Sequence, residues 1–309
     1  MKKCVERILV IGAGVNGSIC AVRLFEAGID VTLLARGARF SFIKEQGVII
    51  DDPFKNTRTV TKVPVIDALL PDDVYDYVLI VVRKNQVPNL LPVLAANKSQ
   101  NLVFMVNNPE GSEMFSQALG AQRVMLGFVF GAGKREGDII RAISPKGLAT
   151  PFGEIGGEKT ERLMRLVAIL RSAGLNARAE TRMNDWLAAH AALVAPFATL
   201  LIKYGTDNYA LAKSKEDVRA LVEGMRETLA VLRALGHRVV PGGTNILSIV
   251  PRFLLVPLVR AFLSTKIAEV GGAWHCSQAP DEMAELAREL KSLVERSGQP
   301  APTLRRILG

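Results

Sequence analysis

Cysteine is scarce in this 309-residue sequence, and the spacing that a metal or redox site requires is missing. The three cysteines, Cys4, Cys20 and Cys276, are far apart and form no CxxC pair. Structural zinc sites and dithiol redox sites are built from closely spaced cysteines. The sequence therefore predicts neither kind of site, and isolated thiols are typical of a protein of the reducing cytosol.

Long uninterrupted hydrophobic runs are also missing. The most apolar stretches, residues 186–202 and 246–263, are interrupted by His190 and Pro196 in the first and by Arg252 in the second. A transmembrane helix needs about 20 consecutive, predominantly apolar residues. We therefore expect two buried helices and no membrane span. Attachment to a membrane surface through residues 246–263 is the less favoured alternative.

Concentrated positive charge is absent, although the chain is basic overall. The net charge of +9 comes from 39 Lys and Arg against 30 Asp and Glu. The basic residues are scattered, without a run of five or six and without interleaved aromatic residues, so the pattern does not favour nucleic acid. A phosphorylated small molecule is the anionic partner that fits this charge best.

The first half of the chain alternates short apolar runs with helical patterns, and a chain of this length can form two domains with a core each. The runs typical of buried parallel strands are residues 8–11, 31–34, 78–82 and 102–106, and helical patterns between them include 18–27 and 87–96. This alternation predicts right-handed crossovers and a doubly wound α/β sheet of the Rossmann type. A further β-rich stretch follows at 123–155, and its turn residues Gly133 and Gly137 predict an antiparallel far edge of the sheet.

The second half has a helical pattern almost throughout. Helical spacing covers residues 183–203, 215–235 and 281–297. We place the domain boundary near residue 178, which gives a Rossmann-type domain at 1–178 and an all-helical domain at 179–309. The C-terminal SGQPAPTLRRILG is typical of a surface tail.

The strongest motif is the glycine sequence that follows the first apolar run. GAGVNG comes directly after RILVI and opens a helical pattern. In the GxGxxG fingerprint, the first glycine permits a tight turn, the second lets a pyrophosphate approach the backbone, and the third lets helix and strand pack closely. The helix N-terminus then faces the phosphate charge. We expect the cofactor to be bound by Gly12, Gly14, Val15, Asn16 and Gly17.

The end of the second strand indicates which form of the cofactor is bound. NAD-binding folds carry an acidic residue about 20 residues after the glycines, where it binds the ribose 2′-hydroxyl. Here that place holds Ala35 and Arg36, with Arg39 close by. A guanidinium can pair with a 2′-phosphate through two hydrogen bonds. The sequence therefore predicts NADP(H) rather than NAD(H), and a simply solvated Arg36 is the alternative.

Taken in order, these landmarks resemble the ketopantoate reductase (2-dehydropantoate 2-reductase) family. GAGVNGS is similar to the family's glycine loop, and Arg36 stands where the family has its NADP-selecting arginine. VVRKNQ resembles the family's Val-Lys-x-x-Gln, with Arg83 in the place of the lysine and Gln86 retained. NNPEG resembles Gln-Asn-Gly-x-Gly, which puts Asn108 on the asparagine near nicotinamide and substrate, and GFVFGAGKREGDII follows the family's Gly-x5-Arg-x-Gly segment.

This resemblance covers residues 7 to about 205, and it implies a fold and a reaction. It implies an N-terminal Rossmann domain, a helical C-terminal domain, and hydride transfer from NADPH to the keto carbon of ketopantoate in the cleft between them. That reaction belongs to pantothenate biosynthesis. The resemblance also implies that Arg83 and Asn108 contribute to cofactor binding.

Several residues that the family uses on its substrate are replaced. The general-acid lysine of the family falls on Ala188 or, in a second register, on Leu187, and its Ser-Ser pair falls on Phe253 and Leu254. The glutamate that holds the substrate hydroxyl falls on Lys266. A site that offers apolar side chains in place of hydrogen-bond partners no longer favours a polar substrate. We therefore expect a substrate more apolar than ketopantoate.

Reduction of a carbonyl or imine requires a proton donor and a group that orients the reacting oxygen or nitrogen. The candidates are Lys266 and His190 as donors and Asn108 as the orienting group. A lysine in an apolar wall would be partly desolvated and a better acid, whereas a solvated helix residue is the alternative. His190 is either a donor at the mouth of the cleft or a core histidine bonded to backbone. His275 lies in a glycine-flanked sequence and is expected to be an exposed turn residue.

Three classes of function remain open from the sequence. The first is an NADPH-dependent reductase of a 2-oxo acid, or of a related carbonyl or imine. The second is ketopantoate reductase in the strict sense, with relocated catalytic groups. The third is a non-catalytic NADP(H)-binding sensor or partner-binding protein. An apolar C-terminal helix offers a homodimer interface, and we expect a cytoplasmic protein.

Overall fold

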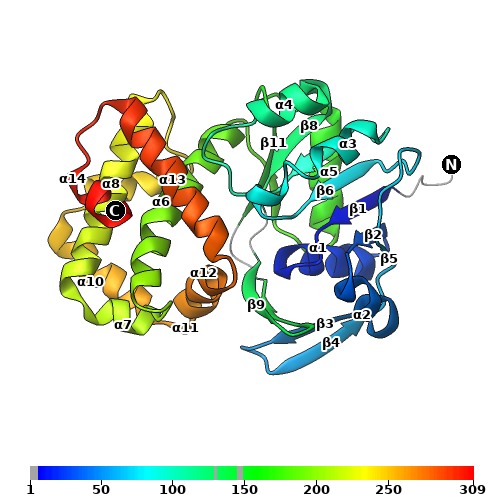
Figure 1. Cartoon of the computed structure of the whole chain (residues 1–309), viewed down its shortest axis with the longest axis horizontal. Coiled ribbons are helices and arrows are strands. Elements are labelled where there is room, and N and C mark those ends of the chain that lie inside the picture. Colours follow the sequence, from blue (N-terminus) through cyan, green and yellow to red (C-terminus); the bar gives the residue numbers. More distant parts are fainter. Residues whose placement is uncertain (1–5, 129–130, 145–148) are drawn as a thin grey trace. The chain divides into compact units, whose positions relative to one another are not determined.

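An eight-stranded sheet organises the N-terminal part of the chain (Figure 1). The computed structural model describes residues 6–128, 131–144 and 149–309. The strands of this sheet are β1 Arg7–Ile11, β2 Asp30–Leu34, β5 Val65–Ile66, β6 Tyr77–Ile80, β7 Leu102–Phe104, β8 Val124–Gly127, β11 Thr150–Glu154 and β12 Ala177–Ala179. Their order is β12-β11-β8-β7-β6-β1-β2-β5, parallel from β5 to β8, with β11 antiparallel to β8 and β12 parallel to β11. The predicted doubly wound α/β fold is confirmed.

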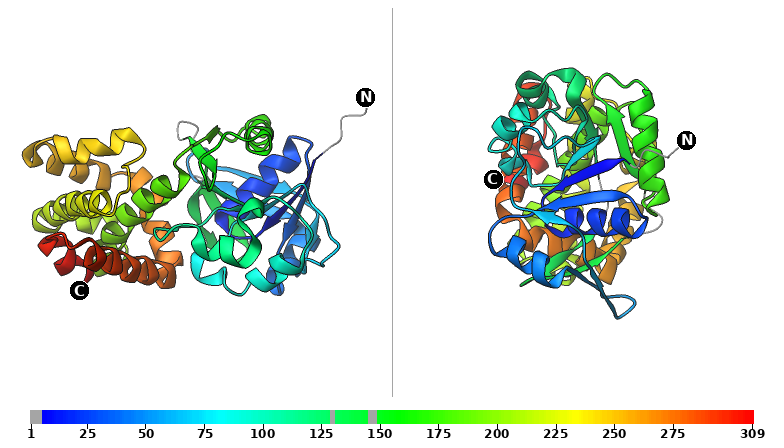
Figure 2. Two further views of the ribbon diagram at one scale, coloured as in Figure 1. Left: turned by 90° about the horizontal axis from the view of Figure 1, so that it is seen from above. Right: turned by 90° about the vertical axis from the view of Figure 1, so that its right-hand side faces the viewer.

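Helices cover both faces of this sheet. They are α1 Val15–Glu26, α2 Ala38–Gln46, α3 Leu91–Ala96, α4 Glu113–Leu119 and α5 Glu161–Ser172, with short 3₁₀ turns η1 Lys84–Gln86 and η2 Ala121–Arg123. Leu24 of α1 and Leu166 of α5 pack in one cluster with Val10 of β1. On the opposite face Phe115 of α4 stacks on Phe104 of β7, with ring centroids 4.1 Å apart. The left-hand view of Figure 2 shows these helices on opposite sides of the sheet.

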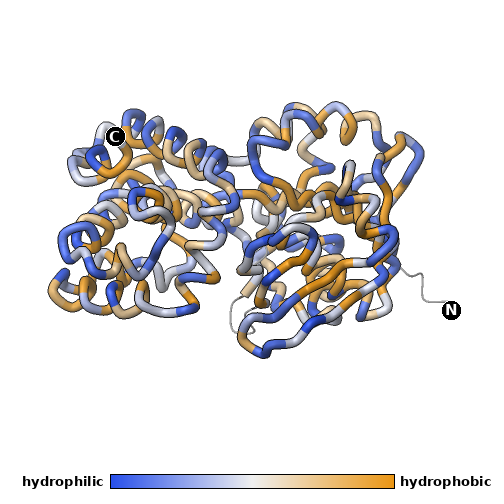
Figure 3. The backbone as a smooth tube through the Cα atoms, turned by 60° about the horizontal axis from the view of Figure 1, so that its bottom comes forward, coloured by the Kyte–Doolittle hydropathy of each residue, from blue (hydrophilic) through white to orange (hydrophobic). Residues whose placement is uncertain are grey.

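Burial on both faces explains why the central strands lack an alternating pattern. Ile8, Leu9 and Val10 of β1 are all fully buried, although successive side chains of a strand point to opposite faces. Figure 3 shows the hydropathy along the chain, with hydrophobic residues in orange and hydrophilic residues in blue. The helix expected over residues 87–96 is shorter, because the chain becomes α-helical only at Leu91, with Pro92 in the first turn.

A second, four-stranded sheet corrects one prediction. It contains β3 Val48–Asp52, β4 Thr57–Thr61, β9 Ala132–Glu136 and β10 Ile139–Ile143, in the order β4-β3-β10-β9. The hairpin that turns at Gly137 pairs with β3 and does not extend the main sheet; the antiparallel strand of the main sheet is β11. Ile19 of α1 packs against Ile140 of this small sheet. The hairpin therefore lies on the side of α1 that faces away from the main sheet. Residues 129–130 of the expected strand lie outside the described residues.

The chain divides into two compact units, Met1–Val106 with Ser112–Met183, and Asn107–Gly111 with Asn184–Gly309. Within the described residues the second unit is helical. Its elements are α6 Met183–Lys203, which begins at the division, α7 Asn208–Lys213, α8 Lys215–Ala234, η3 Gly242–Asn245, α9 Ile246–Ile249, α10 Arg252–Leu263, α11 Lys266–Ala268, the π-helical turn η4 Glu269–Ala273, α12 Trp274–Gln278, α13 Pro280–Ser297 and α14 Pro302–Leu308. The predicted boundary near residue 178, between a cofactor-binding domain and a helical domain, remains a prediction.

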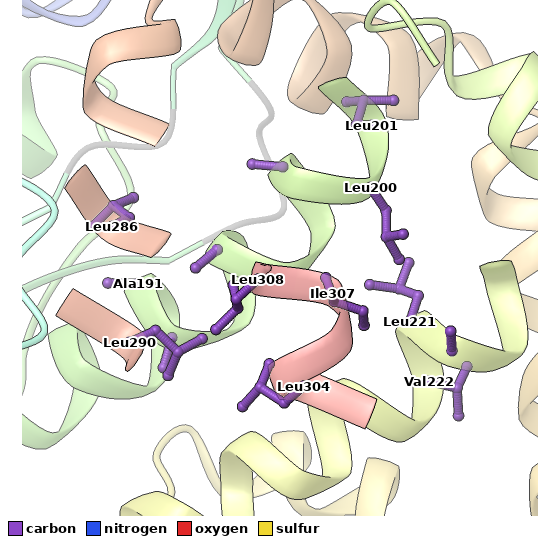
Figure 4. Packing of buried hydrophobic residues seen from close by; sticks show 14 of the residues in the cluster. Ala191, Leu200, Leu201, Leu221, Val222, Leu286, Leu290, Leu304, Ile307 and Leu308 are labelled. Carbon is purple, nitrogen blue, oxygen red and sulfur yellow. The ribbon is translucent and has the colours of Figure 1, made fainter. Parts of the chain in front are cut away.

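The C-terminal residues belong to the core of this helical unit, so the expected surface tail is wrong. Leu304, Ile307 and Leu308 of α14 pack in one cluster with residues of α6, α8 and α13 (Figure 4). Glu227 of α8 accepts hydrogen bonds from the backbone N–H groups of Thr303 and Leu304 at 3.2 and 2.6 Å. A carboxylate at these positions satisfies two of the N–H groups that the start of any helix leaves unpaired.

The two apolar stretches differ in burial. Helix α6 is the one helix within the described residues that is long and apolar enough to cross a membrane, and most of it is packed inside the helical unit, as expected. The stretch 246–263 is different, because Ile249 is 77 % exposed, Phe253 74 % and Leu258 63 %. The prediction of a buried helix is therefore wrong for α10, which buries Leu255, Val256 and Leu263 and leaves its other face exposed.

Leu304→Ala is expected to lower the free energy of unfolding by about 2–4 kcal/mol, because a fully buried side chain is removed and a cavity remains. Urea unfolding followed by circular dichroism measures the loss. Phe253→Ala is the control in the same unit, because its exposed ring should contribute less than about 0.5 kcal/mol. Equal losses in the two variants would show that α14 does not carry core packing.

Candidate functional site

The glycine loop between β1 and α1 is shaped by two close backbone contacts. Gly12 has φ +112°, and a Cβ there would lie 2.3 Å from the carbonyl oxygen of Val81. A Cβ on Gly17 would lie 1.8 Å from the carbonyl oxygen of Gly12. Distances this short exclude any side chain, so both glycines are required by the fold itself.

Gly14 is different, because no atom of the described residues lies close to the position of its Cβ. A Cβ built on Gly14 meets nothing within 4 Å, although Gly14 is the N-cap residue of α1. No side chain in the described part of the chain caps this helix, and its first turn contains no acidic residue, so its N–H groups and its dipole are suited to an anion. The loop therefore fits a pyrophosphate above Gly14, with Val15 in the first turn of the helix.

Asn16 provides a second indication that the loop accommodates a ligand. Its side-chain oxygen Oδ1 is buried and has no hydrogen-bond partner within the described part of the chain. A buried oxygen without a partner costs free energy, so a bound group that donates a hydrogen bond would stabilise it. A Cβ on Gly131 would lie 2.2 Å from this same oxygen. Gly131 thus leaves room for the Asn16 amide.

The two arginines after β2 have different environments. Arg36 is exposed, and no hydrogen bond or ion pair holds its guanidinium among the described residues. Arg39 is 8 % exposed; its Nε donates to the carbonyl oxygen of Ala13 at 3.3 Å and its Nη1 to that of Asp138 at 2.6 Å. Burial and the neighbouring charge of Arg135 lower the pKa of Arg39.

Arg39 thereby connects the glycine loop to the β9–β10 hairpin, a role that the sequence did not reveal. Its third nitrogen, Nη2, is buried and has no partner within the part of the chain that the structure describes. A guanidinium held in this way has one N–H group left for a ligand beside the loop. Arg36 and Arg39 together concentrate positive charge after β2, where the sequence predicted a phosphate.

The carboxyl ends of β1, β6 and β7 meet at one edge of the main sheet. Ile11 pairs with Ile80 and Ile80 with Phe104 at the ends of these strands. Ligands of doubly wound sheets bind outside this edge. Arg83 follows β6 there and is partly buried, whereas its neighbour Lys84 is 5 % exposed and is the more deeply buried cation.

Residues 107–111 follow β7 but pack with the helical unit. Asn108 is buried, and its Nδ2 donates to the carbonyl oxygen of Gly111, which closes the turn. Asn107 instead donates from Nδ2 to Oε1 of Glu282 at 2.8 Å, and its own Oδ1 is buried without a partner among the described residues. The predicted role of Asn108 is not tested by this geometry, and Asn107 is a candidate that the sequence reading missed.

Glu282 also approaches a histidine. Its Oε2 lies 3.8 Å from Nε2 of His275, and the carboxylate is 6 % exposed while the imidazole is 40 % exposed. The expectation that His275 lies in a glycine turn is wrong, because it belongs to α12 and follows the π-helical turn. Gly272 serves close packing, since a Cβ there would lie 2.7 Å from the ring of Phe197. His275 and Glu282 lie on two successive helices, α12 and α13, which are separated by the non-helical residue Ala279, so helical spacing in the sequence gave no signal for this pair.

His190 is also close to this group. Its ring stacks on Trp186 with centroids 5.1 Å apart. Burial, and secondarily the positive charge of His275, lowers the pKa of His190 to about 4. His190 is therefore neutral near pH 7, which does not favour it as a donor of an imidazolium proton.

The remaining positions that the sequence analysis placed in the substrate site have different environments. Lys266 is exposed at the start of α11, so the structure does not provide the burial that we expected to make it a better acid. Ala188 and Leu187 are both 1 % exposed in α6. Leu254 is 48 % exposed on α10. Within the described residues no group of three or more His, Cys, Asp or Glu could hold a metal ion.

The main sheet and the glycine loop have the form of a Rossmann-type dinucleotide-binding fold, and a helical unit follows. Residues 8–150 match the family model described as ketopantoate reductase PanE/ApbA. The predicted resemblance to the ketopantoate reductase family is confirmed over this part of the chain. No curated protein matches the chain in sequence.

Solved structures share the fold over almost the whole chain. The 2-dehydropantoate 2-reductase from Geobacter metallireducens GS-15 is 19 % identical, with 98 % of this chain and 97 % of that chain covered and a TM-score of 0.78. The ternary structure of D-mandelate dehydrogenase with NADH and anilino(oxo)acetate is 15 % identical, with 98 % and 96 % covered and a TM-score of 0.78. A PanE/ApbA family ketopantoate reductase from Ralstonia eutropha JMP134 is 18 % identical, with 98 % and 96 % covered and a TM-score of 0.76.

Alanine substitutions at Gly14 and at Gly17 are expected to affect different properties, cofactor binding for Gly14 and stability for Gly17. Gly17→Ala should lower the melting temperature, because its Cβ meets the Gly12 carbonyl. Gly14→Ala should remain folded, since its Cβ meets no atom of the described residues within 4 Å, but it should lose most of its affinity for a dinucleotide because the methyl group occupies the space for the pyrophosphate. Thermal unfolding and cofactor fluorescence titration separate the two. Unchanged binding in Gly14→Ala would contradict this assignment of the open space.

Proposed function

We propose that the protein is an NADPH-dependent reductase of a 2-oxo acid or of a related carbonyl or imine compound. The observation that carries the proposal is the glycine loop, in which Gly14 leaves open space at an uncapped helix N-terminus and Asn16 holds a buried oxygen without a partner. The match of residues 8–150 to the ketopantoate reductase family model supports the same reaction class. When bound, NADPH supplies the hydride, and the protein supplies position and charge.

The preference for NADPH rests on the two arginines after β2. Arg36 is exposed and uncommitted among the described residues, and Nη2 of Arg39 is a second donor without a partner there. A 2′-phosphate could accept hydrogen bonds from both groups. No acidic residue stands at positions 35–37 to accept a hydrogen bond from the 2′-hydroxyl of NADH.

The proposed substrate is more apolar than ketopantoate. Ala188 stands at the family's lysine, and Leu254 at one of its serines. The structure of D-mandelate dehydrogenase contains anilino(oxo)acetate, a 2-oxo acid derivative with a phenyl ring. A protein of the same fold therefore binds a carboxylate that carries a phenyl ring next to a carbonyl-containing group, and we propose 2-oxo acids with bulky apolar side chains as the substrate class.

Arg36→Ala is expected to weaken NADPH binding by about 1.5–3 kcal/mol and to leave NADH binding nearly unchanged, because only NADPH carries the phosphate. Fluorescence titration with both cofactors measures the difference. Arg23→Ala is the control, because Arg23 is a surface arginine of α1 near Glu26. Equal affinity of the wild type for the two cofactors would refute the assignment to Arg36.

The reaction itself is tested by NADPH oxidation with a panel of 2-oxo acids that includes ketopantoate, branched aliphatic acids and phenylglyoxylate. We expect the highest kcat/KM with a bulky apolar member, because apolar side chains replace the family's polar ones. The highest value with ketopantoate would contradict the proposed substrate class. Cofactor binding without turnover of any member would favour a sensor over a reductase.

A further inference from the structure

The exposed side of α10, together with the short segments before and after it, forms an apolar surface on the helical unit. We call this surface the α10 face. Its large apolar side chains, each between 48 and 77 % exposed, are Ile246, Ile249, Phe253, Leu254, Leu258, Phe262 and Ile267. Single exposed apolar residues are normal on a protein surface, whereas a group of this size marks a surface that binds something.

Helical spacing makes the central part of the α10 face continuous. Two rows of exposed side chains run along α10 at intervals of four residues, as neighbours on one side of a helix do. The rows are Leu254, Leu258 and Phe262 in the first, and Phe253, Pro257 and Ala261 in the second. Neither row contains a charged residue. The opposite side of α10 packs into the core of the unit through Leu255, Val256 and Leu263.

Two arginines of α8, Arg226 and Arg233, hold the segment before α10 in place. The groups of the segment that accept their hydrogen bonds are the carbonyl oxygens of Leu247 and Val250 for Arg226, and the side chains of Asn245 and Ser248 for Arg233. The polar groups of the segment are thereby satisfied by α8, while Ile246 and Ile249 stay exposed. The exposure of these isoleucines is therefore fixed by the packing of the helical unit.

The charges of the stretch that bears the α10 face have one sign. From residue 228 to residue 268 the chain contains no Asp or Glu. The basic residues of this stretch, all exposed, are Arg233, Arg238, Arg252, Arg260 and Lys266. Apolar side chains beside Arg and Lys, without acidic residues, are typical of a surface that binds anionic lipids.

Three of these cations, Arg233, Arg238 and Arg260, have no carboxylate partner within the described residues. Arg260 donates from Nε to the carbonyl oxygen of Ala212 at 3.0 Å, which leaves its positive charge uncompensated. Arg252 differs, because its Nε lies 2.8 Å from Oε2 of Glu223 on α8. The stretch therefore keeps most of its positive charge after the contacts of the helical unit are formed.

A second copy of the chain is the other candidate to cover the α10 face. In a twofold dimer the same surface meets itself, so the cations of one copy would approach those of the other. The stretch has no carboxylate of its own to pair with them. An anionic bilayer complements both properties of the surface, because its headgroups attract the cations and its acyl boundary takes up the apolar side chains. Charge therefore favours lipid over a second copy.

We infer that the α10 face binds the surface of a membrane that contains anionic lipids. The two apolar rows lie between the headgroups, and the cations of the stretch contact the lipid phosphates. Helix α10 has 12 residues, fewer than the about 20 that a span requires, so the attachment is peripheral. The sequence alone favours burial of residues 246–263, and the exposure of α10 reverses that preference. The inference does not depend on the proposed reductase activity.

Sedimentation of the full-length protein with vesicles tests the inference. Vesicles of phosphatidylglycerol mixed with phosphatidylcholine should bind the protein at least about tenfold more strongly than vesicles of phosphatidylcholine alone. Raising NaCl from about 0.1 M to about 1 M should weaken this binding, because the Debye length falls from about 10 Å to about 3 Å. No binding to the anionic vesicles at the lower salt concentration, or equal binding to the two kinds of vesicle, overturns the inference.

Paired substitutions locate the binding surface. Phe253→Ser combined with Leu258→Ser should lower the affinity for anionic vesicles at least about tenfold, because two large apolar side chains are removed from the interface. The matched control combines Val60→Ser with Leu70→Ser, which are 55 and 60 % exposed in the other unit, and it should bind as the wild type does. Both variants should keep a melting temperature near that of the wild type, since the replaced side chains are exposed. Undiminished binding by the α10 variant, or an equal loss in the control, shows that the α10 face is not the binding surface.

Sedimentation equilibrium without lipid separates the membrane from a second copy. The wild type and the variant with Phe253→Ser and Leu258→Ser should have the same oligomeric state, because the α10 face is free in solution. A wild-type dimer that becomes monomeric in this variant would show that a second copy covers the face, and would overturn the inference.

Discussion

The close approach of α1 to the end of β1 determines how the first unit is built. The carbonyl oxygen of Gly12 lies where a Cβ on Gly17 would be, so helix and loop are in backbone contact. This contact fixes the direction in which α1 leaves the sheet, with its N-terminus uncapped and open in front of Gly14. It also places Ile19 against the small sheet and Leu24 against the main one. The same contact that packs the helix therefore produces the anion site.

Much of the fold could be predicted from sequence because the relevant signals are local. Buried parallel strands give uninterrupted apolar runs, and helix α6 begins and ends where its apolar spacing does. The errors concern elements whose partners are distant in sequence. The hairpin β9–β10 pairs with β3, about 90 residues earlier, and α14 packs on α8. The apolar face of α10 has the same composition as a buried helix, so composition alone could not show that it is exposed.

The candidate site likewise has one part that could be predicted from the sequence and one part that could not. The cofactor loop is contiguous, so its glycines identify it without any tertiary information. The cluster around Glu282 joins residues 175 positions apart, and only the fold brings Asn107 to it. The family register directed attention to Asn108 and Lys266, one of which closes its own turn while the other is exposed. The neighbouring Asn107 and the pair His275 and Glu282 have no counterpart in the residues by which the family was recognised.

The allocation of residues 107–111 to the helical unit has a consequence for how this protein can be divided. The chain passes between the two units three times, after Val106, after Gly111 and after Met183. A fragment that begins at Asn184 would contain these helices but would lack the amide that Asn107 gives to Glu282. A recombination event at residue 183 alone would likewise exchange the helices without the loop that completes them. The short loop after β7 and the helices from residue 184 onward therefore belong to one packed unit, although they are far apart in the sequence.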